Sequence, residues 1–162
     1  MQKLNLSYFR INIEQNDAFE RLCRWLGKEP KESHSVTLSE AVDAATDGDV
    51  WKGAAVYMYY NEGWTVFEDL SGHFSFISAE SWLSFAAGDD VLVAGYNDAI
   101  LCAELVIIEK GVVKREFMEI ADDPEAFLNK GDEPQAESWL DIASFVDDDD
   151  IVYSDTGTLL IF

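Results

Sequence analysis

The sequence predicts an α+β fold, in which a single globular domain over residues 1–162 is built on a mainly antiparallel sheet with helices packed on one side and at the ends. Two compositional observations support one folded body: 48% of the residues are hydrophobic and 13% are aromatic, which is enough apolar surface for a core. A third is the order of segments, because runs rich in aromatic and β-branched residues outnumber the amphipathic stretches and no linker separates them.

The N-terminal part is expected to contain one strand and two helices. The second helix has the clearest start signal, because Thr37 and Glu40 stand at the spacing of a capping box. Gly27 is expected to end the first helix. The expected elements are a strand over residues 4–13, a helix from Asn16 or Asp17 to Leu26, a polar loop over residues 28–35 and a helix from Thr37 to about Thr46.

From Asp49 onward the pattern is typical of β structure, with short turns at residues 61–63 and at Lys110-Gly111. Two helices are expected among these strands, from Ser78 to Ala87 and over residues 135–146. The expected strands are 50–60, 64–70, 91–96, 101–109 and 112–120, with residues 122–130 as a loop or a single helical turn and a closing hairpin of residues 151–153 and 158–162.

One five-residue sequence occurs twice, as residues 79–83 and as residues 136–140 (Ala-Glu-Ser-Trp-Leu in both). Each copy precedes acidic residues and then a β-type run, so a duplicated helix–turn–strand unit would explain it. Two independent amphipathic helices would also explain it, and the unequal spacing from the tryptophan to the acids favours that interpretation; neither predicts a function.

Charge is the most informative property of this chain. It carries 32 acidic and 11 basic side chains, a net charge of -21, and residues 116–155 hold 14 of the acids but only one base, Lys130. Such a charge excess repels nucleic acid and anionic lipid and accelerates the capture of a basic partner. The sequence therefore predicts a basic protein partner, with no direct nucleic-acid binding and no membrane association, and leaves the oligomeric state open.

No residue pattern identifies a catalytic, metal or cofactor site. Neither histidine, His34 or His73, has a metal-ligand neighbour at the spacing of a zinc site, and both are expected to be exposed or locally hydrogen-bonded. Cys23 and Cys102 stand in apolar contexts and are expected to be buried free thiols. The start of the chain lacks a signal-peptide pattern, which favours a cytoplasmic location.

The run of four aspartates at 147–150 does not fit a calcium loop, because it lacks the alternating acids, the central glycine and the distal glutamate of that motif. A solvated helix end and an interaction surface are the two readings, and the neighbouring acids favour the second. The expected partner-binding residues are Asp122, Asp123, Asp147, Asp148, Asp149, Asp150 and Asp155.

Three further segments carry a family resemblance. Residues 63–72 (Gly-Trp-Thr-Val-Phe-Glu-Asp-Leu-Ser-Gly), followed by 94–99 (Ala-Gly-Tyr-Asn-Asp-Ala) and 104–108 (Glu-Leu-Val-Ile-Ile), resemble small acidic immunity proteins of bacterial toxin–immunity loci. The resemblance covers roughly residues 60 to 150. It implies a cytoplasmic bacterial protein without enzymatic activity that neutralises one cognate toxin domain, often a basic nuclease.

Three other functions remain open on the sequence. The first is a DNA-mimic regulator of a nucleic-acid-binding protein unrelated to toxins. The second is a small hydrolase in which Asp98 and Glu104 converge from adjacent strands. The third is a scaffold subunit whose acidity serves solubility.

Overall fold

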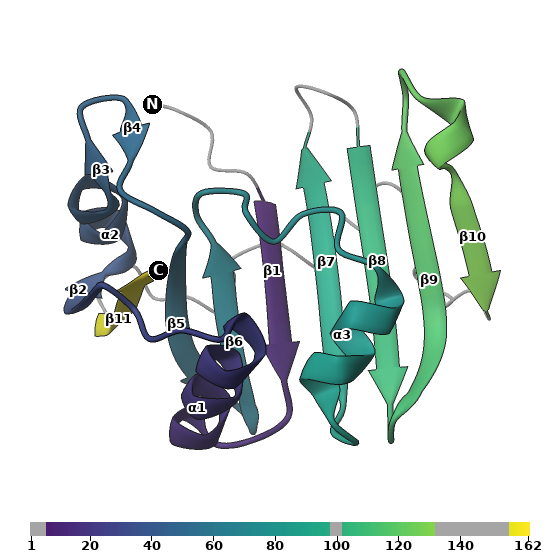
Figure 1. Ribbon diagram of the computed structural model, residues 1–162, viewed down its shortest axis with the longest axis horizontal. Coiled ribbons are helices and arrows are strands. Elements are labelled where there is room, and N and C mark those ends of the chain that lie inside the picture. Colours follow the sequence, from purple (N-terminus) through teal and green to yellow (C-terminus); the bar gives the residue numbers. More distant parts are fainter. Residues whose placement is uncertain (1–5, 98–101, 132–155) are drawn as a thin grey trace.

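Nine antiparallel strands form one continuous sheet in the computed structural model, which describes residues 6–97, 102–131 and 156–162 (Figure 1). In chain order the strands are β1 (Leu6–Ile11), β2 (Glu32–Thr37), β5 (Ala55–Asn61), β6 (Trp64–Asp69), β7 (Val91–Asn97), β8 (Cys102–Glu109), β9 (Val112–Ile120), β10 (Leu128–Gly131) and β11 (Thr156–Ile161). Their order across the sheet is β10-β9-β8-β7-β1-β6-β5-β11-β2. The predicted α+β class is therefore confirmed.

Helices α1 (Gln15–Leu26) and α3 (Ala79–Ala86) cover one face of the sheet, called here the front face (Figure 1). Helix α2 (Leu38–Ala45) packs at the β2 end on the opposite, back face, beside the two-stranded hairpin β3 (Thr46–Asp47) and β4 (Val50–Trp51). The predicted capping box is present, because the Thr37 side chain accepts from the Glu40 backbone and Glu40 bonds back to Thr37. Gly27 ends α1 in the left-handed conformation, as predicted. None of the described helices is long and apolar enough to cross a bilayer.

The main core lies under α1 and α3 and is built on Phe9 of the central strand β1. The Phe9 ring centroid lies 4.9 Å from that of Phe67, 4.9 Å from Trp82 and 5.7 Å from Phe85. Aromatic pairs at these separations add about 0.5–1.5 kcal/mol each beyond the area they bury. Because residues alternate along β1, Tyr8 faces the opposite way and belongs to a separate back-face cluster with Val66 and Leu105.

Three sequence expectations were wrong or incomplete. The second half of the polar loop expected over residues 28–35 belongs instead to the edge strand β2, which begins at Glu32, because β11 supplies backbone partners that a polar sequence does not reveal. The strand expected over 50–60 is interrupted at Gly53, where a Cβ would lie 2.2 Å from the carbonyl oxygen of Phe162. Residues 122–130 contain a 3-10 turn, η1 (Pro124–Ala126), and also the edge strand β10.

Two other expected elements, the helix over 135–146 and the strand over 151–153, lie outside the described residues. The second copy of the repeated sequence lies there too, whereas the first copy begins α3 as expected. Strand β11 was expected to form a hairpin with 151–153. In the structure it pairs with β5 on one side and β2 on the other.

Gly157 provides a test of this packing. A Cβ there would lie 2.5 Å from the Tyr57 ring, whose hydroxyl donates to the Val36 carbonyl at 3.1 Å across β11. We predict that Gly157→Ala lowers the free energy of unfolding by about 1–3 kcal/mol, because the ring must leave its position. Ser35→Ala on the adjacent exposed edge should change it by less than about 0.5 kcal/mol. Urea denaturation measures both, and equal effects would contradict this packing.

Candidate functional site: an acidic corner and a carboxylate-clamped loop

The two expected partner-binding residues that the structure describes lie together at one end of the sheet. Asp122 and Asp123 follow β9 in a tight turn, in which the Asp123 N–H donates to the Ile120 carbonyl at 3.1 Å, and Glu125 follows in η1. All three side chains are exposed, and none forms an ion pair with another described residue. We call Asp122, Asp123 and Glu125 the acidic corner. The other expected residues, Asp147, Asp148, Asp149, Asp150 and Asp155, lie outside the described residues.

The acidic corner is held by the short strand β10. The buried Arg115 guanidinium donates to the Asn129 side chain at 2.6 Å and to the Lys130 carbonyl at 3.0 Å, which ties β10 to β9. Beside the corner, the Phe127 ring is 49% exposed and meets Phe117 edge to face at 6.0 Å between centroids. An exposed aromatic next to uncompensated carboxylates is a composition typical of binding surfaces.

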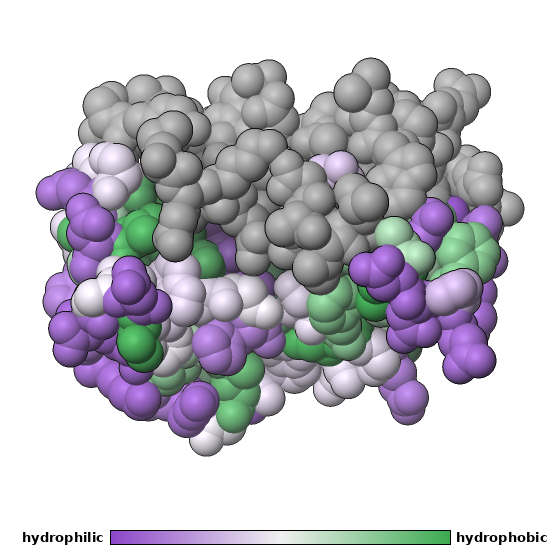
Figure 2. Space-filling view, turned by 90° about the horizontal axis from the view of Figure 1, so that it is seen from above, coloured by the Kyte–Doolittle hydropathy of each residue, from purple (hydrophilic) through white to green (hydrophobic). Residues whose placement is uncertain are grey.

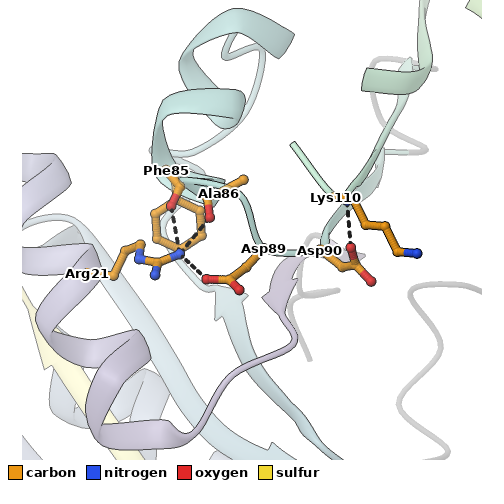
Figure 3. A network of polar contacts seen from close by, with 6 residues as sticks. All are labelled: Arg21, Phe85, Ala86, Asp89, Asp90 and Lys110. Atoms are coloured by element: carbon orange, nitrogen blue, oxygen red, sulfur yellow. Dashed lines mark hydrogen bonds and ion pairs between the residues drawn. The ribbon is translucent and has the colours of Figure 1, made fainter. Parts of the chain in front are cut away.

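Several arginine side chains bond to other parts of the fold and do not pair with the carboxylates of the acidic corner. Arg21 of α1 donates to the Ala86 carbonyl at 2.6 Å and pairs with Asp89 at 2.9 Å, so that it joins α1 to the end of α3 (Figure 3). A cation at a helix C-terminus is favoured there by the helix dipole. Nearby, Asp90 accepts from the Lys110 backbone N–H at 2.8 Å and fixes the β8–β9 turn (Figure 3). Arg10 lies 4.7 Å above the Trp64 ring.

A second feature, the loop of residues 70–78, crosses the front face from β6 to α3 (Figure 1). Its start is fixed by Asp69, which is 3% exposed and accepts from the Gly72 N–H at 2.9 Å and from the Phe74 N–H at 3.0 Å. Phe74 is thereby directed into the main core against Phe9. A buried carboxylate that collects backbone donors in this way is a structural anchor.

The far part of the loop is held by a second buried carboxylate. Glu104 of β8 is 7% exposed and accepts from the Phe76 N–H at 2.8 Å. Phe76 adopts a φ of 62°, in the left-handed region that an aromatic residue rarely occupies, and its ring is 43% exposed. Backbone strain of this kind persists only where the surroundings impose it, and it occurs most often at functional sites.

Burial controls the protonation of both carboxylates. Desolvation raises the pKa of Glu104 from 4.5 to about 7, the Phe76 hydrogen bond opposes that rise, and the nearby charge of Asp69 adds to it. Desolvation also raises the pKa of Asp69, against the opposing effect of its backbone donors. Near neutral pH, then, Glu104 titrates within the fold.

The hydrolase alternative requires a carboxylate pair that a substrate can reach. Asp98 lies outside the described residues, and Glu104 lies beneath the 70–78 loop with its carboxylate engaged by Phe76. Glu68 and Asp69 were expected to face opposite sides of the sheet. They do so, since Glu68 accepts from the Tyr59 hydroxyl on the back face at 3.3 Å.

The histidines and cysteines serve local roles, as expected. The His34 ring bonds to Glu32 at 3.0 Å, and His73 bonds to the Ser71 hydroxyl at 2.6 Å. Both cysteines are buried, and they form no disulfide with each other. Cys23 borders an open hollow at the end of α1, but burial and the neighbouring Glu29 raise the pKa of its thiol to about 11, so the thiol is protonated at neutral pH. Within the described ranges, no group of three or more His, Cys, Asp or Glu side chains is placed to hold a metal ion.

Comparison of the chain with protein-family models, with curated proteins and with solved structures finds no match. The function therefore has to be argued from the site itself.

Glu104→Gln tests the buried carboxylate, because glutamine keeps an acceptor for the Phe76 N–H and cannot ionise. The folded pKa of Glu104 lies above the unfolded value, so the native state holds more protons between pH 4.5 and about 7. Stability from this group is therefore full below pH 4.5 and is lost as the pH rises to about 7. We predict that the variant matches the parent at low pH and exceeds its free energy of unfolding by on the order of 2–3 kcal/mol at pH 8.

Urea denaturation at a series of pH values measures this difference. Glu109→Gln, at an exposed position of the same strand, is the matched control and should change stability by less than about 0.5 kcal/mol. A difference for Glu104→Gln that is the same at both ends of the pH range would show that folding does not raise the pKa of Glu104.

Proposed function

We propose that this chain is an immunity-type inhibitor that binds a basic cognate toxin domain, such as a nuclease, in the bacterial cytoplasm and occludes its active site. The observation that carries the proposal is the set of exposed, uncompensated carboxylates at the acidic corner of a chain with a net charge of -21. The same segment of sequence continues into Asp147, Asp148, Asp149, Asp150 and Asp155, which the proposal includes as further acidic determinants.

The contacts of the arginine side chains support this proposal. Arg21 and Arg115 bond to carbonyl groups within the fold, Arg21 also pairs with Asp89, and Arg10 stacks on Trp64, so none of the three neutralises the acidic corner. Asp122, Asp123 and Glu125 are left to solvent. Like charges concentrated on one surface raise the free energy of the unbound protein, and a cationic partner relieves that repulsion.

Occlusion requires two contributions with different physical roles. Carboxylates take the place of the phosphates that a nuclease expects and, through their long-range field, set the rate of association. An apolar or aromatic centre excludes water and supplies most of the affinity. Phe127, beside the acidic corner, is one exposed aromatic placed for the second role.

Co-expression with the product of the gene immediately upstream tests the proposal. We expect the parent chain to rescue cells from that product, and the triple charge reversal Asp122→Lys, Asp123→Lys, Glu125→Lys to weaken binding at least a hundredfold, or about 3 kcal/mol. The affinity of the purified pair, measured by calorimetry, gives the second readout.

The matched control is the reversal Asp43→Lys, Asp47→Lys, Asp49→Lys. These three exposed acids lie around α2 and β3, at the other end of the sheet, and the change in net charge is the same. If the control weakens binding as much as the corner variant, only net charge matters and the acidic corner is not the binding surface. Failure of the parent chain to rescue cells would reject the immunity function.

A further inference from the structure

An apolar strip lies on the front face beside the acidic corner. The β-ladder places Met118 of β9 between Glu104 of β8 and Leu128 of β10, so these three side chains share one face. Ile120 lies two residues further along β9 on the same face, and the Phe76 backbone is bonded to Glu104. We call Phe76, Met118, Ile120 and Leu128 the apolar strip.

Solvent reaches the apolar strip. Phe76 is 43% exposed, and the other three side chains are partly exposed. Among the described residues, α3 covers the lower part of β8 and β9, and no helix lies in front of β10 (Figure 1). At the end of the molecule where β9, β10 and η1 lie, hydrophobic and hydrophilic surfaces adjoin each other (right-hand side of Figure 2).

The charge around the apolar strip is mostly negative. Asp122, Asp123 and Glu125 follow its upper end along the chain, and Glu116 lies at its lower end opposite Lys130. An apolar surface rimmed by carboxylates is complementary to an apolar surface rimmed by Lys and Arg. Self-association through this strip would place the same carboxylates against each other, which disfavours a second copy as the occupant.

Phe76 is held in an exposed position, where its ring can contact a partner, although its left-handed backbone conformation is unfavourable. Two buried carboxylates fix the loop, Asp69 at the Phe74 N–H and Glu104 at the Phe76 N–H, and the Phe76 backbone stays in the left-handed region although its ring is 43% exposed. A residue that served only the free fold would relieve this strain by being glycine or asparagine. A rigid aromatic displayed next to charge is what an interface anchor requires, because little side-chain entropy remains to be lost on binding.

We propose that the apolar strip, with Phe76 as its anchor, is the docking surface for an apolar patch edged by Lys and Arg on a partner protein. This inference deepens the proposed function and rests on it for the partner's identity, but the chemistry of the surface is testable alone. The acidic corner increases the rate at which the partner associates, and the apolar strip slows its dissociation.

The direct test is binding of a synthetic helical peptide of about sixteen residues, with a leucine stripe flanked by lysines. We expect it to bind and to shift the amide resonances of Phe76, Met118 and Leu128, and Phe76→Ser to weaken binding at least tenfold by fluorescence anisotropy. Phe76→Asn, which tolerates the left-handed backbone, should have the same effect while the melting temperature does not fall.

Tyr60→Ser is the matched control, because Tyr60 is a similarly exposed aromatic (49%) on β5, away from the strip. It should leave peptide affinity unchanged. Peptides with glutamate in place of lysine, or serine in place of leucine, should not bind. Binding that is insensitive to both Phe76 variants, or resonance shifts away from the strip, would overturn the inference.

Two further measurements separate the inference from the proposed function. Sedimentation of the parent chain alone should show a monomer; a dimer that Phe76→Ser dissolves would make a second copy the occupant and would overturn the inference. In the co-expression assay Phe76→Ser should lose rescue. If the parent chain fails to rescue, the immunity function falls, whereas the peptide result still decides the strip.

Discussion

The arrangement of the proposed binding surface depends on the burial of two carboxylates in a chain with 11 basic and 32 acidic side chains. Asp69 and Glu104 are satisfied by backbone N–H groups of one loop, and no arginine or lysine among the described residues pairs with either. Hydrogen bonds to backbone donors offset part of the desolvation cost, which is why the pKa of Glu104 still rises to about 7. That cost is tolerated because the same bonds hold the 70–78 loop and display Phe76.

The arginines that stabilise the fold lie away from the acidic corner, so they do not weaken its negative electrostatic field. Arg21 joins the two front-face helices through carbonyl groups, and Arg115 fixes β10 in the same way. Both arginines thus satisfy backbone carbonyls, and Arg21 also pairs with Asp89, while the exposed carboxylates of the acidic corner keep their long-range field. Among the described residues, α1 and α3 cover the centre of the front face and no helix covers β10 (Figure 1), so an apolar surface lies next to that field. In the proposed function, the acidic corner raises the rate of association with the partner and the apolar strip slows its dissociation.

Much of the fold followed from local sequence signals, because capping residues, short turns and alternating strands act over a few residues. The predictions of a capping box at Thr37 and of a turn at Lys110-Gly111 were confirmed for that reason. Strand β2 was missed because its stability comes from pairing with β11, more than a hundred residues away. For the candidate site, charge composition predicted that Asp122 and Asp123 lie on an exposed surface, which they do, but no sequence pattern indicated Phe76, whose exposed position and left-handed backbone depend on tertiary contacts. A lone glutamate in the apolar run 102–108 was the available signal for Glu104.

The proposal that the acidic corner controls association and the apolar strip controls dissociation is tested most directly by binding kinetics. The association and dissociation rate constants with the upstream gene product are measured as the salt concentration is varied. Between about 0.02 and 0.5 M salt, the Debye length falls from about 20 Å to about 4 Å. We predict that the association rate constant drops at least tenfold over this range while the dissociation rate constant changes less than about threefold. An association rate that does not depend on salt, or a salt dependence found mainly in dissociation, would contradict the account.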